Sequence, residues 1–75
     1  MDFTQELDAT GLNCPLPILR TKKTLAPMAS GDILKVIATD PGSVKDLEAF
    51  CKQTGDTLEL SSHVNGKFEF YIKKA

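Results

Sequence analysis

The sequence predicts an α/β (α+β) two-layer sandwich, in which a mixed four-stranded sheet has two helices packed on one face. Helical patterns of apolar residues alternate with the first strands, and two further alternating strands end the chain, which gives the order βαβαββ. A parallel βαβ unit followed by an antiparallel hairpin makes the sheet mixed. Two helices are most simply packed on the same face, which leaves the other face of the sheet open.

Length and charge limit the function classes. The chain has 75 residues, so we expect one domain spanning residues 1–75 and no large internal pocket. It carries 9 Lys+Arg and 10 Asp+Glu, for a net charge of −1. This balance argues against direct, stable binding of nucleic acid. We find neither a signal-peptide pattern nor a run of about 20 apolar residues, so we expect a cytoplasmic protein without a membrane span.

The first strand and helix are predicted around a short break. Residues 3–9 alternate, with Phe3, Leu7 and Ala9 on one side, which is typical of a half-buried strand. Residues 10–13 interrupt it, and a helical stretch follows Cys14 to about Met28. The apolar face of this helix is formed by Ile18, Thr21, Leu25 and Met28. Gly31 follows the helix at the position that glycine often takes there.

The second strand and helix are predicted over residues 33–39 and from about residue 40 to Gly55. The apolar and β-branched run at 33–39 suits an interior strand. Two starts of the helix are open: Asp40 as N-cap before Pro41, or Ser43 as N-cap with Asp46 three residues later. The apolar face of this helix contains Val44, Leu47, Phe50, Cys51 and Thr54.

The last two strands, residues 58–64 and 67–73, are predicted to form a hairpin. A two-residue Asn65-Gly66 turn pairs His63 with Phe68, which places the apolar sets of the two strands on opposite faces. A three-residue loop with a glycine bulge pairs Leu60 with Phe70 instead. Because the buried face sets the register, we favour the three-residue loop.

Cys14 is the candidate for chemistry. It stands in Cys14-Pro15-Leu16-Pro17, and we expect it to be the N-cap of the first helix, with Pro15 at the first helical position. A helix dipole stabilises a nearby thiolate by roughly 0.3–1 kcal/mol, which lowers the pKa of the thiol by only roughly 0.2–0.7. The local sequence therefore indicates a moderately activated cysteine.

Three roles compete for Cys14. It can pack as a small apolar side chain, serve as the nucleophile of a hydrolase or protease, or carry a transferable group. A hydrolase needs an adjacent base, and the one histidine, His63, is expected on the polar side of a late strand. A carrier needs only an exposed sulfur, which suits a chain too small for a substrate pocket. Cys51 lies on an apolar helix face, where core packing is favoured over a role as resolving thiol.

Two blocks of residues match a known family. The first is Asp8-Ala9-Thr10-Gly11-Leu12-Asn13-Cys14-Pro15-Leu16-Pro17, followed by Arg20 and Lys23. The second contains Gly31-Asp32-Ile33-Leu34, Thr39-Asp40-Pro41-Gly42, Asp46-Leu47 and Phe50-Cys51. In these residues the chain resembles the TusA-like (SirA-like) sulfur-carrier proteins over nearly its whole length.

The resemblance implies a sulfurtransferase that carries sulfane sulfur as a persulfide on Cys14. It implies a cysteine desulfurase or rhodanese-like protein as donor and a downstream sulfur-acceptor protein, in tRNA thiolation, molybdenum cofactor synthesis or sulfur oxidation. The sulfur is carried covalently, so we expect no separate cofactor and no metal, and a monomer is the simplest expectation. The chemistry is thiolate attack on a sulfane sulfur.

The remaining candidate residues have supporting roles. Asp8 and Gly11 are expected to shape the turn that presents Cys14, and Pro15 and Pro17 to stiffen it. Possible docking residues are Arg20, Lys22, Lys23 and Asp40. In an alternative function, the chain is a non-catalytic binding or regulatory module that docks through the Cys-Pro-Leu-Pro turn and the open sheet face.

Overall fold

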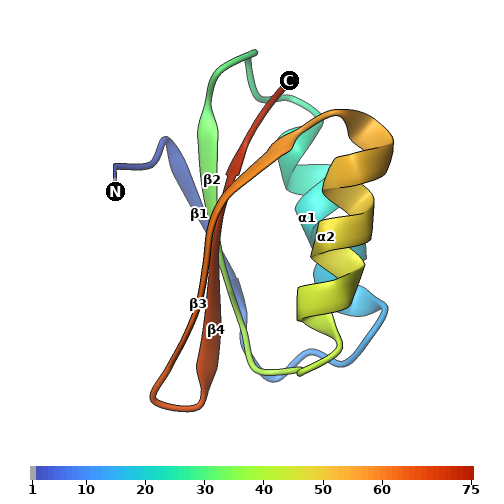
Figure 1. Ribbon diagram of the computed structural model, residues 1–75, viewed down its shortest axis with the longest axis vertical. Helices are drawn as coiled ribbons and strands as arrows, with labels where there is room; N and C mark the ends of the chain where they lie inside the picture. Colours follow the sequence, from blue (N-terminus) through green and yellow to red (C-terminus); the bar gives the residue numbers. More distant parts are fainter. Residues whose placement is uncertain (1) are drawn as a thin grey trace.

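The sheet and helices follow the predicted order. The computed structural model describes residues 2–75. Its elements are β1 (Gln5–Ala9), α1 (Leu16–Leu25), β2 (Ile33–Ala38), α2 (Ser43–Thr54), β3 (Thr57–Val64) and β4 (Lys67–Lys73). The strand order is β1-β2-β4-β3, with β1 and β2 parallel and the other neighbours antiparallel. Both helices cover the same face of the sheet (Figure 1), so the predicted two-layer fold is confirmed.

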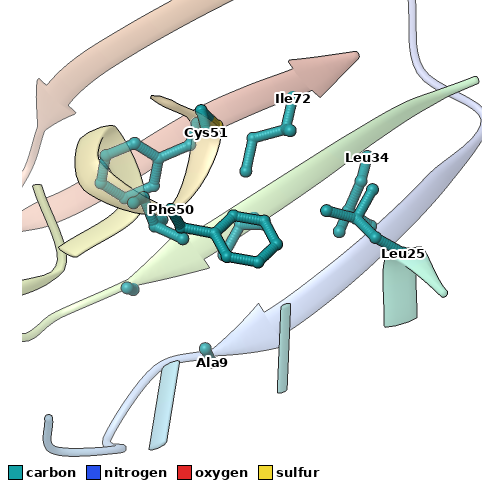
Figure 2. Close-up of a cluster of buried hydrophobic side chains, with 10 residues drawn as sticks. Ala9, Leu25, Leu34, Phe50, Cys51 and Ile72 are labelled. Atoms are coloured by element: carbon teal, nitrogen blue, oxygen red, sulfur yellow. The ribbon is translucent and has the colours of Figure 1, made fainter. Parts of the chain in front are cut away.

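The core lies between the helices and the covered face of the sheet. Figure 2 shows Leu25 of α1 and Phe50 of α2 among side chains of the strands, including Leu34 and Ile72. Most of the two predicted helix faces is confirmed, since the buried residues include Thr21, Leu25, Leu47, Phe50 and Cys51. Thr54 is the exception, because its side chain is exposed. This packing holds α1 and α2 side by side, with both N-termini at the end of the sheet where β1 and β2 finish (Figure 1).

The helix ends differ from the sequence predictions at both N-termini and at the C-terminus of α1. Helix α1 ends at Leu25 with Ala26 as its C-cap, so it does not reach Met28, and Gly31 does not cap it. Helix α2 has Gly42 as its N-cap, so neither Asp40 nor Ser43 is the cap. Asp40 instead accepts a hydrogen bond from the Gly42 amide through its side chain (3.2 Å) and one from the Ser43 amide through its carbonyl (3.0 Å). The helix ends as predicted at Gly55, which adopts the left-handed conformation at φ 84°.

The β3–β4 hairpin contains the turn that the sequence analysis rejected. Val64 pairs with Lys67 across a two-residue Asn65-Gly66 turn, and both turn residues have positive φ (51° and 76°). The predicted three-residue loop is therefore wrong. A register shift between Leu58 and Leu60 reconciles this turn with a buried face. It keeps Leu58 opposite Ile72 but places Leu60 opposite Tyr71.

The open face of the sheet is partly apolar. Lys35 lies near its centre and pairs with Glu6 and Glu69, at 3.8 and 4.0 Å. The Phe3 ring lies 6.3 Å from the Tyr71 ring and 5.4 Å from Nζ of Lys35. Phe3 therefore belongs to the open face, and its predicted placement beside the core residues Leu7 and Ala9 is wrong, because β1 begins only at Gln5.

Candidate functional site

The β1–α1 loop begins with a tight turn. The Asp8 carboxylate accepts hydrogen bonds from the Thr10 amide and the Thr10 hydroxyl, at 3.0 and 2.7 Å. These two hydrogen bonds lower the pKa of Asp8, because they favour the charged carboxylate. Gly11 follows with φ 79°, a conformation that side chains other than glycine rarely adopt. The chain thereby turns away from the sheet immediately before Cys14.

The β1–α1 loop is joined to the β2–α2 loop by two hydrogen bonds. The Gly11 amide donates to the hydroxyl of Thr39 at 2.9 Å, and the Cys14 amide donates to Oδ2 of Asp40 at 2.6 Å. Both loops leave the sheet at the carboxyl ends of neighbouring parallel strands, which meet at one edge. Asp40 therefore lies at the same end of the sheet as Cys14, as the topology predicts.

Cys14 lies one residue before the N-cap of α1. The N-cap is Pro15, whose peptide bond with Cys14 is cis, and the first helical residue is Leu16. The amide of Leu16 donates to the carbonyl of Asn13 at 2.8 Å. The prediction that Cys14 is the N-cap is therefore wrong, and its side chain is free to contact another element.

The Cys14 thiol contacts the other helix. Its Sγ atom donates a hydrogen bond to Oδ2 of Asp46, in the first turn of α2, at 2.7 Å. This hydrogen bond raises the pKa of Cys14; desolvation and the negative charges of Asp46 and Asp40 raise it further. The moderate activation predicted from the dipole of α1 is therefore wrong, because the two carboxylates near the sulfur dominate.

The chain matches a known protein family over nearly its whole length. The family model described as sulfurtransferase TusA matches residues 5–74. The chain belongs to the TusA family. It is 69% identical over 74 residues to a sulfur carrier protein TusA from Allochromatium vinosum, covering 99% of this chain and 97% of that protein. It is 43% identical over 75 residues to a sulfur carrier protein TusA from Pseudomonas putida, covering 97% and 94% of the two chains.

A solved structure agrees with this family assignment. A SirA-like protein from Desulfitobacterium hafniense superposes with a TM-score of 0.83 at 30% identity, covering 93% of this chain and 96% of that one. Both the TusA-family relatives and the SirA-like fold thus agree with the resemblance found in the sequence. Membership of the TusA family supports a role in sulfur transfer, and both relatives are named as sulfur carrier proteins.

The two cysteines of this TusA-family chain differ sharply in environment. Cys14 is exposed, whereas Cys51 is 5% exposed on the core side of α2. Burial raises the pKa of Cys51 to about 11, with a smaller contribution from Asp56. The two thiols are both free, and only Cys14 is open to a partner.

The supporting prolines and the basic residues lie in different surroundings. Pro15 is exposed beside Cys14, whereas Pro17 is fully buried. The side chains of Arg20, Lys22 and Lys23 are exposed on α1. Lys22 lines a cleft of about 300 Å³ with Phe50 and Lys74, at the C-terminal ends of the helices, whereas Cys14 precedes the N-terminus of α1. Lys22 therefore lies away from the sulfur.

Neither the histidine nor a metal cluster adds to the site. His63 stacks on Phe68, with ring centroids 4.3 Å apart, on the same face of the sheet as the core. The prediction that His63 lies on the polar side is wrong, since it assumed regular alternation along β3, which the register shift between Leu58 and Leu60 breaks. Among residues 2–75, no group of three or more His, Cys, Asp or Glu side chains is arranged to hold a metal ion. No helix in this range is long and apolar enough to cross a membrane.

Sequence reasoning missed the role of two residues at the site. Thr39 joins the two loops, and Asp46 contacts the sulfur directly. In the sequence, Asp46 was considered only as part of a possible helix cap and of the family match, and Thr39 only as part of that match. The order of the strands and helices could have indicated both Thr39 and Asp46. A helix that starts at the carboxyl end of β2 places its first turn beside the loop that leaves β1.

Proposed function

We propose that this chain carries sulfane sulfur as a persulfide on Cys14 and passes it to an acceptor protein. The observation that carries the proposal is that Cys14 is exposed on a loop anchored by Asp40 and Asp46, in a chain that belongs to the TusA family. The sulfur needs no separate cofactor, because it is held covalently. A cysteine desulfurase or rhodanese-like protein fits the role of donor, and a downstream thiol protein that of acceptor.

The chemistry is an exchange without net oxidation. Sγ of Cys14 attacks the outer sulfur of a donor persulfide, the new Sγ–S bond forms, and the donor's own S–S bond breaks. The donor leaves with the electron pair as a thiolate, which takes up the proton that Cys14 releases. An acceptor then attacks the outer sulfur on Cys14, and Cys14 returns to the thiol state.

The exposure of Cys14 fits a reaction between two proteins. The clefts of about 300 and 330 Å³ are lined by other residues, so Cys14 lies in neither of them. A donor protein must therefore bring its own persulfide to the sulfur. An enclosed substrate site is not needed for this reaction, because the donor and the acceptor supply the surrounding groups.

Loading by polysulfide tests the proposal without a partner protein. After incubation and removal of excess reagent, we expect an intact mass gain of about 32 Da on the wild type and on Cys51→Ser, lost on reduction. The Cys14→Ser variant should gain none. Equal loading of Cys14→Ser would contradict the proposal. A non-catalytic docking module would keep its partner binding and biological activity in Cys14→Ser, whereas the proposal predicts complete loss of sulfur transfer from donor to acceptor.

A further inference from the structure

Two carboxylates lie against the reactive cysteine. Oδ2 of Asp46 is 2.7 Å from Sγ of Cys14, and Oδ2 of Asp40 is 2.6 Å from the Cys14 amide nitrogen. Among residues 2–75, neither carboxylate forms an ion pair, since the ion pairs found there join Lys35 to Glu6 and Glu69. The sulfur thus lies near two carboxylates that no cationic side chain in this range pairs, which is an unusual environment for a cysteine that must act as a nucleophile.

The unloaded thiol fits this environment. A neutral thiol has one proton on Sγ and can donate it to Asp46, as the structure shows. A thiolate at the same place would put a third negative charge beside Asp40 and Asp46, and these charges raise the pKa of Cys14. In the unloaded state the sulfur is therefore kept protonated and held against α2.

The loaded sulfur does not fit. In a persulfide, Sγ is bonded to Cβ and to the outer sulfur, so it has no proton left to donate to Asp46. The outer sulfur of a persulfide is also more acidic than a thiol and is an anion near neutral pH. Loading thus replaces an attractive hydrogen bond with the repulsion of a negative sulfur by two carboxylates.

We propose that Asp46 is a catalytic residue that distinguishes the two states of Cys14, holding the unloaded thiol and expelling the loaded persulfide toward solvent. This inference rests on the proposed persulfide function. As the Sγ–S bond forms, Asp46 accepts the Sγ proton and passes it to the departing donor thiolate. The products are the carrier persulfide anion and the neutral donor thiol, so protons and charge balance. The expelled outer sulfur is then open to the acceptor.

The test compares the reactivity of the two states of Cys14. All proteins carry Cys51→Ser, so that Cys14 is the only reacting cysteine. The rate of alkylation by iodoacetamide is measured against pH for the unloaded and the polysulfide-loaded protein. The variant is Asp46→Asn, and the matched control is Glu48→Gln, which removes one charge from an exposed position on the same helix.

We expect the wild-type loaded form to react much faster than the unloaded form near neutral pH. In Asp46→Asn, the pH profile of the alkylation rate of the unloaded thiol should shift to lower pH. Unloaded Cys14 should then react several-fold faster near neutral pH, so that the ratio of the loaded rate to the unloaded rate falls several-fold. Glu48→Gln should keep the wild-type ratio. Asp46→Glu restores the charge and should lie closer to the wild type. Asp46→Ala also removes the carboxylate, and it serves as the test with the same expected shift if Asp46→Asn does not fold.

Two results separate the failure of this inference from failure of the proposed function. If the wild type gains no sulfur on Cys14, the proposed function fails, and the inference fails with it. If sulfur is loaded but Asp46→Asn keeps the wild-type profile and ratio, the carrier function stands and the role of Asp46 is overturned. A shift of equal size in Glu48→Gln would also overturn it, because the effect would then come from net charge alone.

Discussion

The sulfur of Cys14 lies 2.7 Å from a carboxylate oxygen of Asp46, 32 residues further along the chain and on the other helix. This contact exists because β1 and β2 are parallel neighbours, so that the loops leaving them and the helices that follow start at the same end of the sheet. Cys14 is thereby held by the second βα unit of the fold, although its own helix follows it directly. The site is a product of the tertiary structure.

The anchoring of the Cys14 loop can be tested with Asp40. Replacing Asp40 by Ala removes the acceptor of the Cys14 amide, so the hydrogen exchange of that amide should become about tenfold faster or more. Asp32→Ala is the control, because Asp32 accepts the Ala29 amide in a separate turn at 3.0 Å. Unchanged exchange at Cys14 in Asp40→Ala would contradict the proposed anchor.

The buried cysteine should make stability depend on alkaline pH. The folded state raises the pKa of Cys51 from its ordinary 9.0 to about 11 through burial. A group with a raised folded pKa contributes stability below its unfolded pKa and loses it as pH rises through the folded value. The wild-type free energy of unfolding should therefore fall more between pH 9 and 11 than that of Cys51→Ala. Both proteins carry Cys14→Ser, because Cys14 titrates too; parallel pH curves would refute this prediction.

The register of the hairpin predicts different costs for two neighbouring leucines. Leu58 packs partly against the core, whereas Leu60 is 43% exposed on the open face. Leu58→Ala should lower the free energy of unfolding by about 1–3 kcal/mol, and Leu60→Ala by less than about 1 kcal/mol. Urea denaturation of the two variants measures the difference. A larger loss for Leu60→Ala than for Leu58→Ala would contradict the register shift between these two residues.

The Ser43 hydroxyl is buried, and Oγ has no hydrogen-bond partner among the described residues. An unpaired buried hydroxyl is destabilising, and alanine favours a helix more than serine does. Ser43→Ala should therefore keep or raise the free energy of unfolding, by up to about 1 kcal/mol. Thermal or urea denaturation measures this change. A loss of about 1 kcal/mol or more would show that the hydroxyl does form a hydrogen bond.

Periodicity was sufficient to predict the fold, because each element has a clear apolar pattern. The faces containing Leu25 and Leu47 and the end of α2 at Gly55 follow directly from the sequence. The hairpin register does not, because alternation assumes a regular strand, and the shift between Leu58 and Leu60 breaks that assumption. A two-residue Asn65-Gly66 turn and a Leu58 side chain packed against the core are compatible only when the strand is irregular.

The candidate site was predicted in position but not in chemistry. The sequence indicates Cys14 through its place before two prolines and through family resemblance, and the order of strands brings Asp40 near it. The activation of the thiol depends on charges that come from another helix. A local estimate from the dipole of α1 could not include Asp46, and for that reason the direction of the pKa shift was wrong.

The most direct test of the central claim is loading by a physiological type of donor. The wild type, Cys14→Ser and Cys51→Ser are each incubated with a cysteine desulfurase and cysteine, and their intact masses are measured before and after reduction. We predict a reducible gain of about 32 Da on the wild type and Cys51→Ser, and none on Cys14→Ser. A wild type that gains no sulfur, or a Cys14→Ser variant that gains as much as the wild type, would contradict the account.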